Sequence, residues 1–530
     1  MRWVDKDKRL VLIAAIMGTA VVSVDSTVVN VALPAIRSDL GGGLAGQQWI
    51  SNAYLLTLSS LILVAGSLGD LFGEKRVFTL GVAGFGVASL ICAVAPTIEL
   101  LVVARALQGV FGALLTPAGL AVIAATFPPE ERGRAVGLWT AWGGIGIVAG
   151  PLIGGQLVDS ASWRWIFAIN VPLVIATLWL VARAVPESRP REGVKLDLMG
   201  AVLCAAGLAG ITFGLIEQPL NGWGSGAVAG PLVGGALLFV GFIVHELRTA
   251  QPMLPLALFR RRNFSVTNAE TFLMYGGLSM LFFFLIVFLQ QVAGYSALEA
   301  GLATLPVTIV MFVASGRFGG LADRHGPHLF LSAGPIIAAG GYALLLRLDA
   351  GADYLTQLLP ALMIFAIGLS MTVAPLTATV LADADESNAG IASAVNNAIA
   401  RVAGLIAIAA VGAIVSAAIS GHITIPGAGS TEVRSALAHA RNAPFAPPMT
   451  AGLSPREAAS VRAEVSDASL YGFHYAVAIG SLLVLLAGLL GAIGLRNPTC
   501  KSRRAEGCPG GQIAGVPQIV AEHVPERVAA

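Results

Sequence analysis

Hydrophobic residues fall along this chain in long runs of roughly twenty residues, with short polar segments between them. A run of that length forms an α-helix that crosses about 30 Å of hydrocarbon. The pattern therefore predicts an all-α, polytopic membrane protein. We expect fourteen spans, at Leu10–Ala32, Trp49–Leu68, Val77–Ala95, Leu100–Phe127, Ala135–Val158, Trp165–Ala182, Leu198–Ile216, Ala227–Val244, Thr271–Gln291, Gly301–Leu321, Leu329–Leu346, Leu355–Leu381, Ile391–Ile419 and Tyr475–Leu495. The seventh and eighth runs contain many glycines and a short connection, so they also fit a re-entrant hairpin.

A short polar loop after the second run is repeated far downstream. The first copy is Gly66–Arg76 and the weaker second copy is Gly319–Gly326. The aligned pairs are Gly66 with Gly319, Leu68 with Leu321, Asp70 with Asp323, and Gly73 with Gly326. The copies lie eight predicted helices apart, an even number, so they share one orientation. This indicates two six-helix halves, residues 1–185 and 266–497, with two inserted helices and a cytoplasmic linker at 186–265.

The composition and the placement of charge add the orientation. Of all residues 56% are hydrophobic and only 12% are charged, whereas soluble domains carry about 25% charged residues. Basic residues favour cytoplasmic loops. With the N-terminus inside, the basic residues on the inner side are Arg2, Lys6, Lys8, Arg9, Lys75, Arg76, Arg132, Arg134, Arg189, Arg191, Lys195, Arg248, Arg260, Arg261, Arg262, Arg324, Lys501, Arg503 and Arg504. We therefore expect a multi-pass plasma-membrane protein with both termini in the cytoplasm.

Two segments lie outside this pattern. Gly421–Leu470, rich in Ala, Pro and Ser, is expected to form a flexible or partly helical outer loop. Residues 498–530 are expected to be a disordered cytoplasmic tail. The four cysteines lack the spacing of a disulfide framework or a zinc site, so no metal or cofactor is expected.

Two charged residues stand inside predicted spans. Asp25 lies within the first, about seven residues from its outer end, and Arg105 lies about five residues into the fourth. Both therefore belong to the outer half of the bilayer, and Gln108 follows Arg105 by one turn. An acid inside a membrane is costly and is expected to face water or a partner. A neighbouring Arg favours the ionised acid and desolvation disfavours it, so such a group can change protonation with its surroundings. A static salt bridge is the alternative.

The fifth span carries an unusual density of glycine around a central proline. Proline removes a backbone hydrogen bond and bends a helix, and glycines at four-residue spacing expose backbone for close packing. The pattern predicts a bent, closely packed hinge or seal. Its residues are Gly137, Gly146, Gly150, Pro151, Gly154 and Gly155.

With these motifs the chain resembles the major facilitator superfamily, specifically its fourteen-helix drug:proton antiporters of the QacA/EmrB type. Gly66–Arg76 is similar to the superfamily's loop motif, Asp25–Pro34 to the first-helix motif of this branch, and the glycine pattern to the antiporter motif. Trp163–Pro172 is similar to the signature that follows the fifth helix. The resemblance implies proton coupling through Asp25 and Arg105. It implies conformational roles for Gly66, Asp70, Gly73, Lys75, Arg76, Asp323, Gly146, Gly150, Pro151, Gly154 and Gly155.

The resulting hypothesis is a proton-coupled exporter of drugs or other lipophilic small molecules, working by alternating access. Protons, membrane lipids and a small-molecule substrate are its expected partners, with no nucleic acid, and a monomer is expected. Weaker candidates for substrate contacts are Asn30, Gln108, Glu217 and Glu270, although the two glutamates also fit interfacial charges at helix ends. An exporter of an endogenous metabolite or antibiotic, or a lipid flippase, is the alternative. A membrane enzyme or receptor is disfavoured because the chain has no large soluble domain and no paired metal-ligand motif. An ATP-driven pump is disfavoured because the phosphate-binding GxxxxGK[ST] pattern is missing.

Overall fold

The computed structural model describes residues 6–187, 196–382, 389–425 and 430–497, and within these ranges all regular secondary structure is helical. The α-helices are α1 Lys6–Leu40, α2 Gly43–Phe72, α3 Glu74–Ala93, α4 Ile98–Thr126, α5 Pro129–Ser160, α6 Trp165–Ala168, α7 Asn170–Ala184, α8 Leu198–Asn221, α9 Gly226–Arg248, α10 Arg262–Gln291, α11 Ala297–His325, α12 Pro327–Leu344, α13 Leu359–Ala382, α14 Ala389–His422, α15 Thr431–Asn442 and α16 Pro455–Gly494. Three short elements join them: η1 Leu256–Arg260, η2 Leu345–Arg347 and the π-helical turn η3 Tyr354–Leu358.

The predicted spans are confirmed as long helices. In the described ranges 13 helical stretches are long and apolar enough to cross a membrane. The 32-residue helix α5 occupies the place of the remaining predicted span. The sixth span is interrupted at Ile169, which separates α6 from α7. The alternative of a re-entrant hairpin is wrong, because α8 and α9 are full-length helices of 24 and 23 residues.

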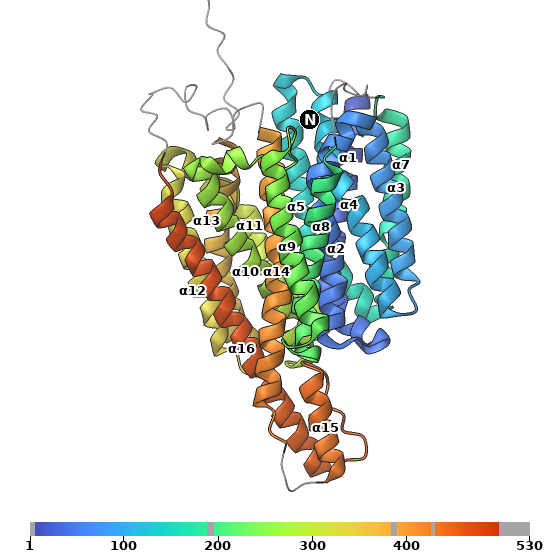
Figure 1. Cartoon of the computed structure of the whole chain (residues 1–530), viewed down its shortest axis with the longest axis vertical. Helices are drawn as coiled ribbons and strands as arrows, with labels where there is room; N and C mark the ends of the chain where they lie inside the picture. Colours follow the sequence, from blue (N-terminus) through green and yellow to red (C-terminus); the bar gives the residue numbers. More distant parts are fainter. Residues whose placement is uncertain (1–5, 188–195, 383–388, 426–429, 498–530) are drawn as a thin grey trace, which may run out of the picture.

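The helices form two six-helix halves with α8 and α9 between them (Figure 1). The first half contains α1–α7, and the second contains α10–α14 and α16. The inserted helix α8 packs against α2 of the first half and α14 of the second. Close packing of α8 on α9 is possible because Gly207 lies against the backbone of Phe239, and Gly210 against that of Gly235.

We call the end of the bundle where α1 begins the N-terminal face, and the opposite end the far face. The far face carries the segment that the sequence predicts as an outer loop, and this segment is largely helical (lower part of Figure 1). It contains α15, and α16 begins at Pro455, well before the predicted start of this helix at Tyr475. A capping box explains that early start, since the Ser454 hydroxyl accepts from the backbone of Glu457 and the Glu457 carboxylate accepts in return from Ser454. Glu457 also accepts from the Ser430 hydroxyl at 2.8 Å, which ties α15 to α16.

The described residues join the two halves by hydrogen bonds near the far face. The Asp159 carboxylate, at the end of α5, accepts from the first amide groups of α11, at 3.1 Å from Ala297 N and 2.8 Å from Leu298 N. The Gln48 amide on α2 donates to Ile408 O on α14 at 2.6 Å, and the Gln290 amide on α10 donates to Val31 O on α1 at 2.8 Å. Since these bonds all lie toward one face, the structure is closed at the far face.

Candidate functional site

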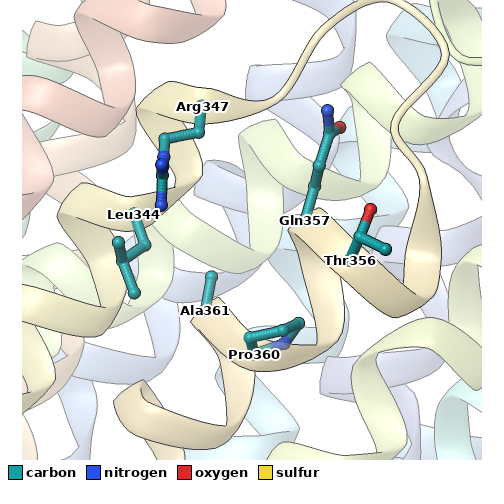
Figure 2. A pocket seen from close by; sticks show the side chains of 6 residues that line it. All are labelled: Leu344, Arg347, Thr356, Gln357, Pro360 and Ala361. Carbon is teal, nitrogen blue, oxygen red and sulfur yellow. The ribbon is translucent and has the colours of Figure 1, made fainter.

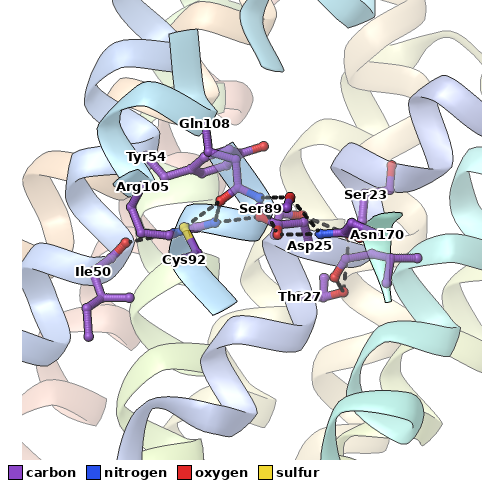
Figure 3. Close-up of polar contacts among 12 residues, drawn as sticks. Ser23, Asp25, Thr27, Ile50, Tyr54, Ser89, Cys92, Arg105, Gln108 and Asn170 are labelled. Carbon is purple, nitrogen blue, oxygen red and sulfur yellow. Dashed lines mark hydrogen bonds and ion pairs between the residues drawn. The ribbon is translucent and has the colours of Figure 1, made fainter. Parts of the chain in front are cut away.

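The polar centre of the first half is built around Asp25. This residue is fully buried, and its two carboxylate oxygens accept from three side chains. Oδ2 accepts from Arg105 Nη1 at 2.5 Å, and Oδ1 accepts from Gln108 Nε2 at 2.8 Å and Asn170 Nδ2 at 3.1 Å (Figure 3). The donors come from α4 and α7, so the carboxylate links α1 to both. The sequence does not decide whether Asp25 faces water or other side chains. The structure shows that it contacts Arg105, Gln108 and Asn170.

Arg105 is equally well enclosed. Its Nη1 also donates to Gln108 Oε1 at 2.6 Å, and its Nε donates to Ile50 O on α2 at 3.2 Å. The guanidinium carbon lies 4.3 Å from the centre of the Tyr54 ring, a cation–π distance. A buried guanidinium with a carboxylate, two carbonyl-type acceptors and an aromatic face is well satisfied. The pair is therefore a stable element of this conformation.

Two glycines of α4 bring Arg105 to these partners. A Cβ atom at Gly109 would clash with Thr57 Oγ1 and Tyr54 O, and one at Gly112 would touch Leu58. The Thr57 hydroxyl donates across the same contact to Ala106 O at 2.7 Å. The small residues thus let α4 approach α2 closely, and that approach sets the position of the Arg105 side chain.

The glycine pattern of α5 makes contacts with both halves. Gly150 and Gly154 lie against α1, where a Cβ atom would clash with the side chains of Thr27 and Val28. Gly155 faces the other half, and a Cβ atom there would lie 2.5 Å from Leu298 Cα on α11. A Cβ atom at Gly301 of α11 would in turn lie 2.6 Å from Pro151 O. The helix thus packs on α1 with one face and across to α11 with the other. The surroundings of Gly146 lie outside the described residues.

The repeated loops have nearly the same backbone. Gly73, between α2 and α3, has φ 89° and ψ 134°, and Gly326, between α11 and α12, has φ 87° and ψ 148°. Each amide N–H bonds to the carbonyl four residues earlier, Gly69 O at 2.9 Å and Ala322 O at 2.8 Å. Positive φ values of this kind favour glycine, so the shared glycine has a shared structural cause.

The other residues of the loop motif are on the N-terminal face. Lys75 forms an ion pair with Glu187 at 3.3 Å, and Arg76 is exposed. A Cβ atom at Gly66 would meet open space. The side chains of Asp70 and Asp323 lie outside the described residues.

Comparison with known proteins decides the family. The profile of the Major Facilitator Superfamily matches residues 15–408. The chain belongs to the Major Facilitator Superfamily. It is 33% identical over 490 residues to the tetracenomycin C resistance and export protein of Streptomyces glaucescens, covering 90% of this chain and 89% of that protein. It is 38% identical over 407 residues to a puromycin resistance protein of Streptomyces alboniger, covering 75% of this chain and 80% of that protein.

Solved structures agree on the fold. A bacterial homologue of the human lysosomal transporter Spinster, in an inward-facing and unoccupied conformation, matches with a TM-score of 0.66 at 16% identity, over 94% of this chain and 100% of that one. A D-xylose–proton symporter matches with a TM-score of 0.60 at 15% identity, over 93% of this chain and 99% of that one. These similarities establish the major facilitator fold.

Within this fold the weaker candidates are scattered. Asn30 is partly exposed on α1, and Gln108 belongs to the Asp25 network. Glu217 accepts from the Trp49 indole N–H at 3.3 Å, which joins the inserted helix α8 to α2. These four candidates, Glu270 included, do not gather into one site.

Glu270 requires a correction. The sequence suggests an interfacial charge or a substrate contact, but the side chain is fully buried within the second half. In the part of the chain that the structure describes, neither carboxylate oxygen has a hydrogen-bond partner. Gly491 on α16 leaves room for it, since a Cβ atom there would lie 3.4 Å from Glu270 Oε2. Glu270 is therefore a buried residue of the second half and not an interfacial charge.

A separate cavity of about 300 Å³ opens near the far face, between the end of α12 and the start of α13 (Figure 2). It is lined by Leu344, Arg347, Thr356, Gln357, Pro360 and Ala361. In the described ranges no group of three His, Cys, Asp or Glu side chains could hold a metal ion.

Several members of the Asp25 network were not predicted. Ser89 on α3 accepts from Gln108 Nε2 at 2.9 Å and from Asn170 Nδ2 at 3.3 Å, and Cys92 donates to Gln108 Oε1 at 3.7 Å. Asn170 stands within the Trp163–Pro172 signature, as a single polar residue between apolar ones. That isolation is the sequence signal that would have pointed to it.

Proposed function

We propose that this chain is a proton-coupled exporter of lipophilic small molecules, and that Asp25 is the group that takes up and releases the proton. The observation that carries the proposal is the fully buried Asp25 carboxylate, held by Arg105, Gln108 and Asn170. The names of the relatives, which refer to resistance and export, support the direction of transport and the class of cargo.

Protonation of Asp25 would remove the charge that holds Arg105. The guanidinium would then keep only neutral acceptors, and α1 would lose its ionic tie to α4. Because Gly150 and Gly154 of α5 pack directly on α1, a movement of α1 would be transmitted to α5. Since α5 in turn contacts α11 through Gly155, the change would reach the joint between the halves. This sequence of contacts is the route by which a proton would alter the closure at the far face.

The orientation of the protein in the membrane determines from which side cargo would bind. We infer from the placement of Lys and Arg that the N-terminal face is cytoplasmic and that the protein lies in the plasma membrane with both termini inside. The conformation closed at the far face would then bind cargo from the cytoplasm or the inner leaflet. An exporter of an endogenous metabolite or antibiotic would use the same machinery with a different cargo. A lipid flippase is the other alternative. It would move lipid molecules across the membrane of vesicles that contain the protein and lipid but no drug.

A susceptibility screen tests this proposal. Cells with and without the protein are exposed to many toxic compounds, and the screen is repeated with the proton gradient collapsed. We expect protection against a set of lipophilic compounds that disappears with the gradient. Protection that persists without the gradient would contradict proton coupling, and no protection against any compound would contradict drug export.

A further inference from the structure

The second half carries a charged residue that the mechanism above does not use. Arg401 lies on α14, inside the membrane-spanning stretch Ile391–His422. It is partly exposed, but its Nε is buried and has no hydrogen-bond partner among the described residues. A guanidinium in the middle of a membrane is costly and marks a functional site by default.

The neighbours of Arg401 place it between the two halves. On one side, Ala398 packs in a cluster with Leu58 and Ile62 of α2. On the other side, Gly404 faces α10, where a Cβ atom would lie 2.5 Å from Ser279 Oγ. Arg401 lies on α14 between these two contacts, so its side chain is directed to the place where α2 and α10 flank α14.

One tyrosine from each half lies near this position. Tyr54 on α2 and Tyr275 on α10 are close enough to act electrostatically on the Arg401 guanidinium. Tyr54 also stacks on Arg105, so a single ring lies beside the Asp25 network and within electrostatic reach of Arg401. One turn closer to the N-terminal face, Asn397 is exposed on α14. Arg401 thus has polar and aromatic neighbours from both halves.

The acidic residues of the described membrane helices are bound or enclosed away from Arg401. Asp25 is paired with Arg105, Glu217 accepts from Trp49, and Glu270 is enclosed within the second half. Glu246 accepts from the amide of Leu254 at 2.8 Å. Within the described residues, therefore, no carboxylate forms an ion pair with Arg401. Its charge therefore has no acidic counter-charge among these residues.

We propose that Arg401 is the anion-binding residue of the cargo site, and that the preferred cargo is a lipophilic aromatic molecule carrying one acidic group, a carboxylate, sulfonate or phenolate. The inference rests on the proposed export function, which requires a cargo site. Arg suits this role because its planar guanidinium binds an oxyanion through two N–H groups and also stacks on aromatic rings. When the halves close around cargo and exclude water, the acidic group supplies the counter-charge that Arg401 then needs.

A matched pair of fluorescent probes tests the inference. 8-Anilinonaphthalene-1-sulfonate is an anion, and N-phenyl-1-naphthylamine has the same framework without the sulfonate. Binding of each is measured to the full-length protein in phosphatidylcholine nanodiscs, with empty nanodiscs subtracted and without a proton gradient. We expect Arg401→Gln to weaken binding of the sulfonate about tenfold or more, with Arg401→Lys between it and the wild type. Binding of the neutral probe should be unchanged.

The control variant is Arg347→Gln, which removes an arginine from the far-face cavity and should leave both probes unchanged. Equal losses for both probes in Arg401→Gln, or no loss for either, would overturn the inference. A loss for the sulfonate in Arg347→Gln alone would move the anion site to the far face and would also overturn it.

The wild-type protein gives a second test that requires no variant. 2-Naphthoate should displace the sulfonate probe, and 2-naphthalenemethanol, with the same ring and no charge, should not. Equal displacement by both compounds would contradict an anion site. Because binding is measured without a gradient, anion binding without export would overturn only the proposed function. Export without any preference for anions would overturn only this inference.

Discussion

At the scale of single residues, the protein isolates one ion pair from water. Both members of the Asp25–Arg105 pair are buried, and Gln108, Asn170 and Ile50 O form further hydrogen bonds with them. Removing one partner of a buried pair leaves an uncompensated charge, which is far more costly than removing both. This asymmetry makes the pair testable by stability alone.

Arg105→Gln should lower the free energy of unfolding by about 3–5 kcal/mol, because Asp25 is left as a buried carboxylate without its counter-charge. The double variant Asp25→Asn with Arg105→Gln should recover much of that loss. Thermal unfolding of the purified protein in detergent measures both. A double variant no more stable than Arg105→Gln would show that the ion pair is not what stabilises this part of the fold.

At the scale of elements, the helices contact one another where glycine removes a side chain. The sequence predicts close packing at the glycines of α5, but it does not predict which neighbouring helix each glycine contacts. Gly150 and Gly154 serve the packing on α1, and Gly155 serves the contact with α11. Which neighbour a glycine faces depends on the rotation and tilt of the helix, and these are set by the whole bundle.

Gly155→Leu should open the closure at the far face, since its side chain would collide with the backbone at Leu298. A cysteine at Ala300, which is fully buried in α11, reports the change. In a protein without other cysteines, we expect an impermeant thiol reagent added from the far side to label Ala300→Cys only when Gly155→Leu is also present. Gly234→Leu on α9 is the control, because a Cβ atom there meets open space. Equal labelling with both leucine variants would contradict a closure at Gly155.

The helical segment on the far face is attached by Arg37. This side chain at the end of α1 donates to Gln291 Oε1 at 3.1 Å and to Pro444 O at 2.9 Å. Arg37→Ala should therefore free the segment, and trypsin should cleave faster after Arg434 and Arg441. Arg164→Ala removes a partly exposed ion pair with Asp39, which is worth about 0–1 kcal/mol, and contacts with Ala95 O and the Trp163 ring. Since none of these contacts involves the far-face segment, the cleavage rate should be unchanged. Equal rates in the two variants would show that Arg37 does not hold the segment.

At the scale of the whole molecule, hydrophobic runs and the repeated loop were sufficient to predict the helices, the halves and the inserted pair. This is because lipid allows a spanning segment few alternatives to a helix. The far-face segment was less predictable, since its helices depend on a capping box at Ser454 and on contacts such as that of Arg37. The charged pair of Asp25 and Arg105 could be predicted from its cost in lipid. The burial of Glu270 and the position of Arg401 could not, because they depend on which helices meet.

The orientation of the whole molecule is tested by single cysteines on exposed positions of the two faces. Ser435→Cys on α15 and Arg76→Cys at the start of α3 are suitable. On intact cells an impermeant thiol reagent should label Ser435→Cys alone, and permeabilised cells should show both. Labelling of Arg76→Cys on intact cells would reverse the proposed topology.

The central claim is that Asp25 carries the transported proton. The most direct measurement is accumulation of an identified cargo in vesicles with an imposed pH gradient, comparing the wild type with Asp25→Asn and Asp25→Glu. Asparagine keeps the shape and part of the hydrogen bonding but cannot exchange a proton. We therefore predict that Asp25→Asn still binds cargo but no longer accumulates it against a gradient, and that Asp25→Glu retains part of the activity with an altered pH profile. Gradient-driven accumulation by Asp25→Asn would contradict the account and would assign coupling to another acid, Glu270 or Glu217.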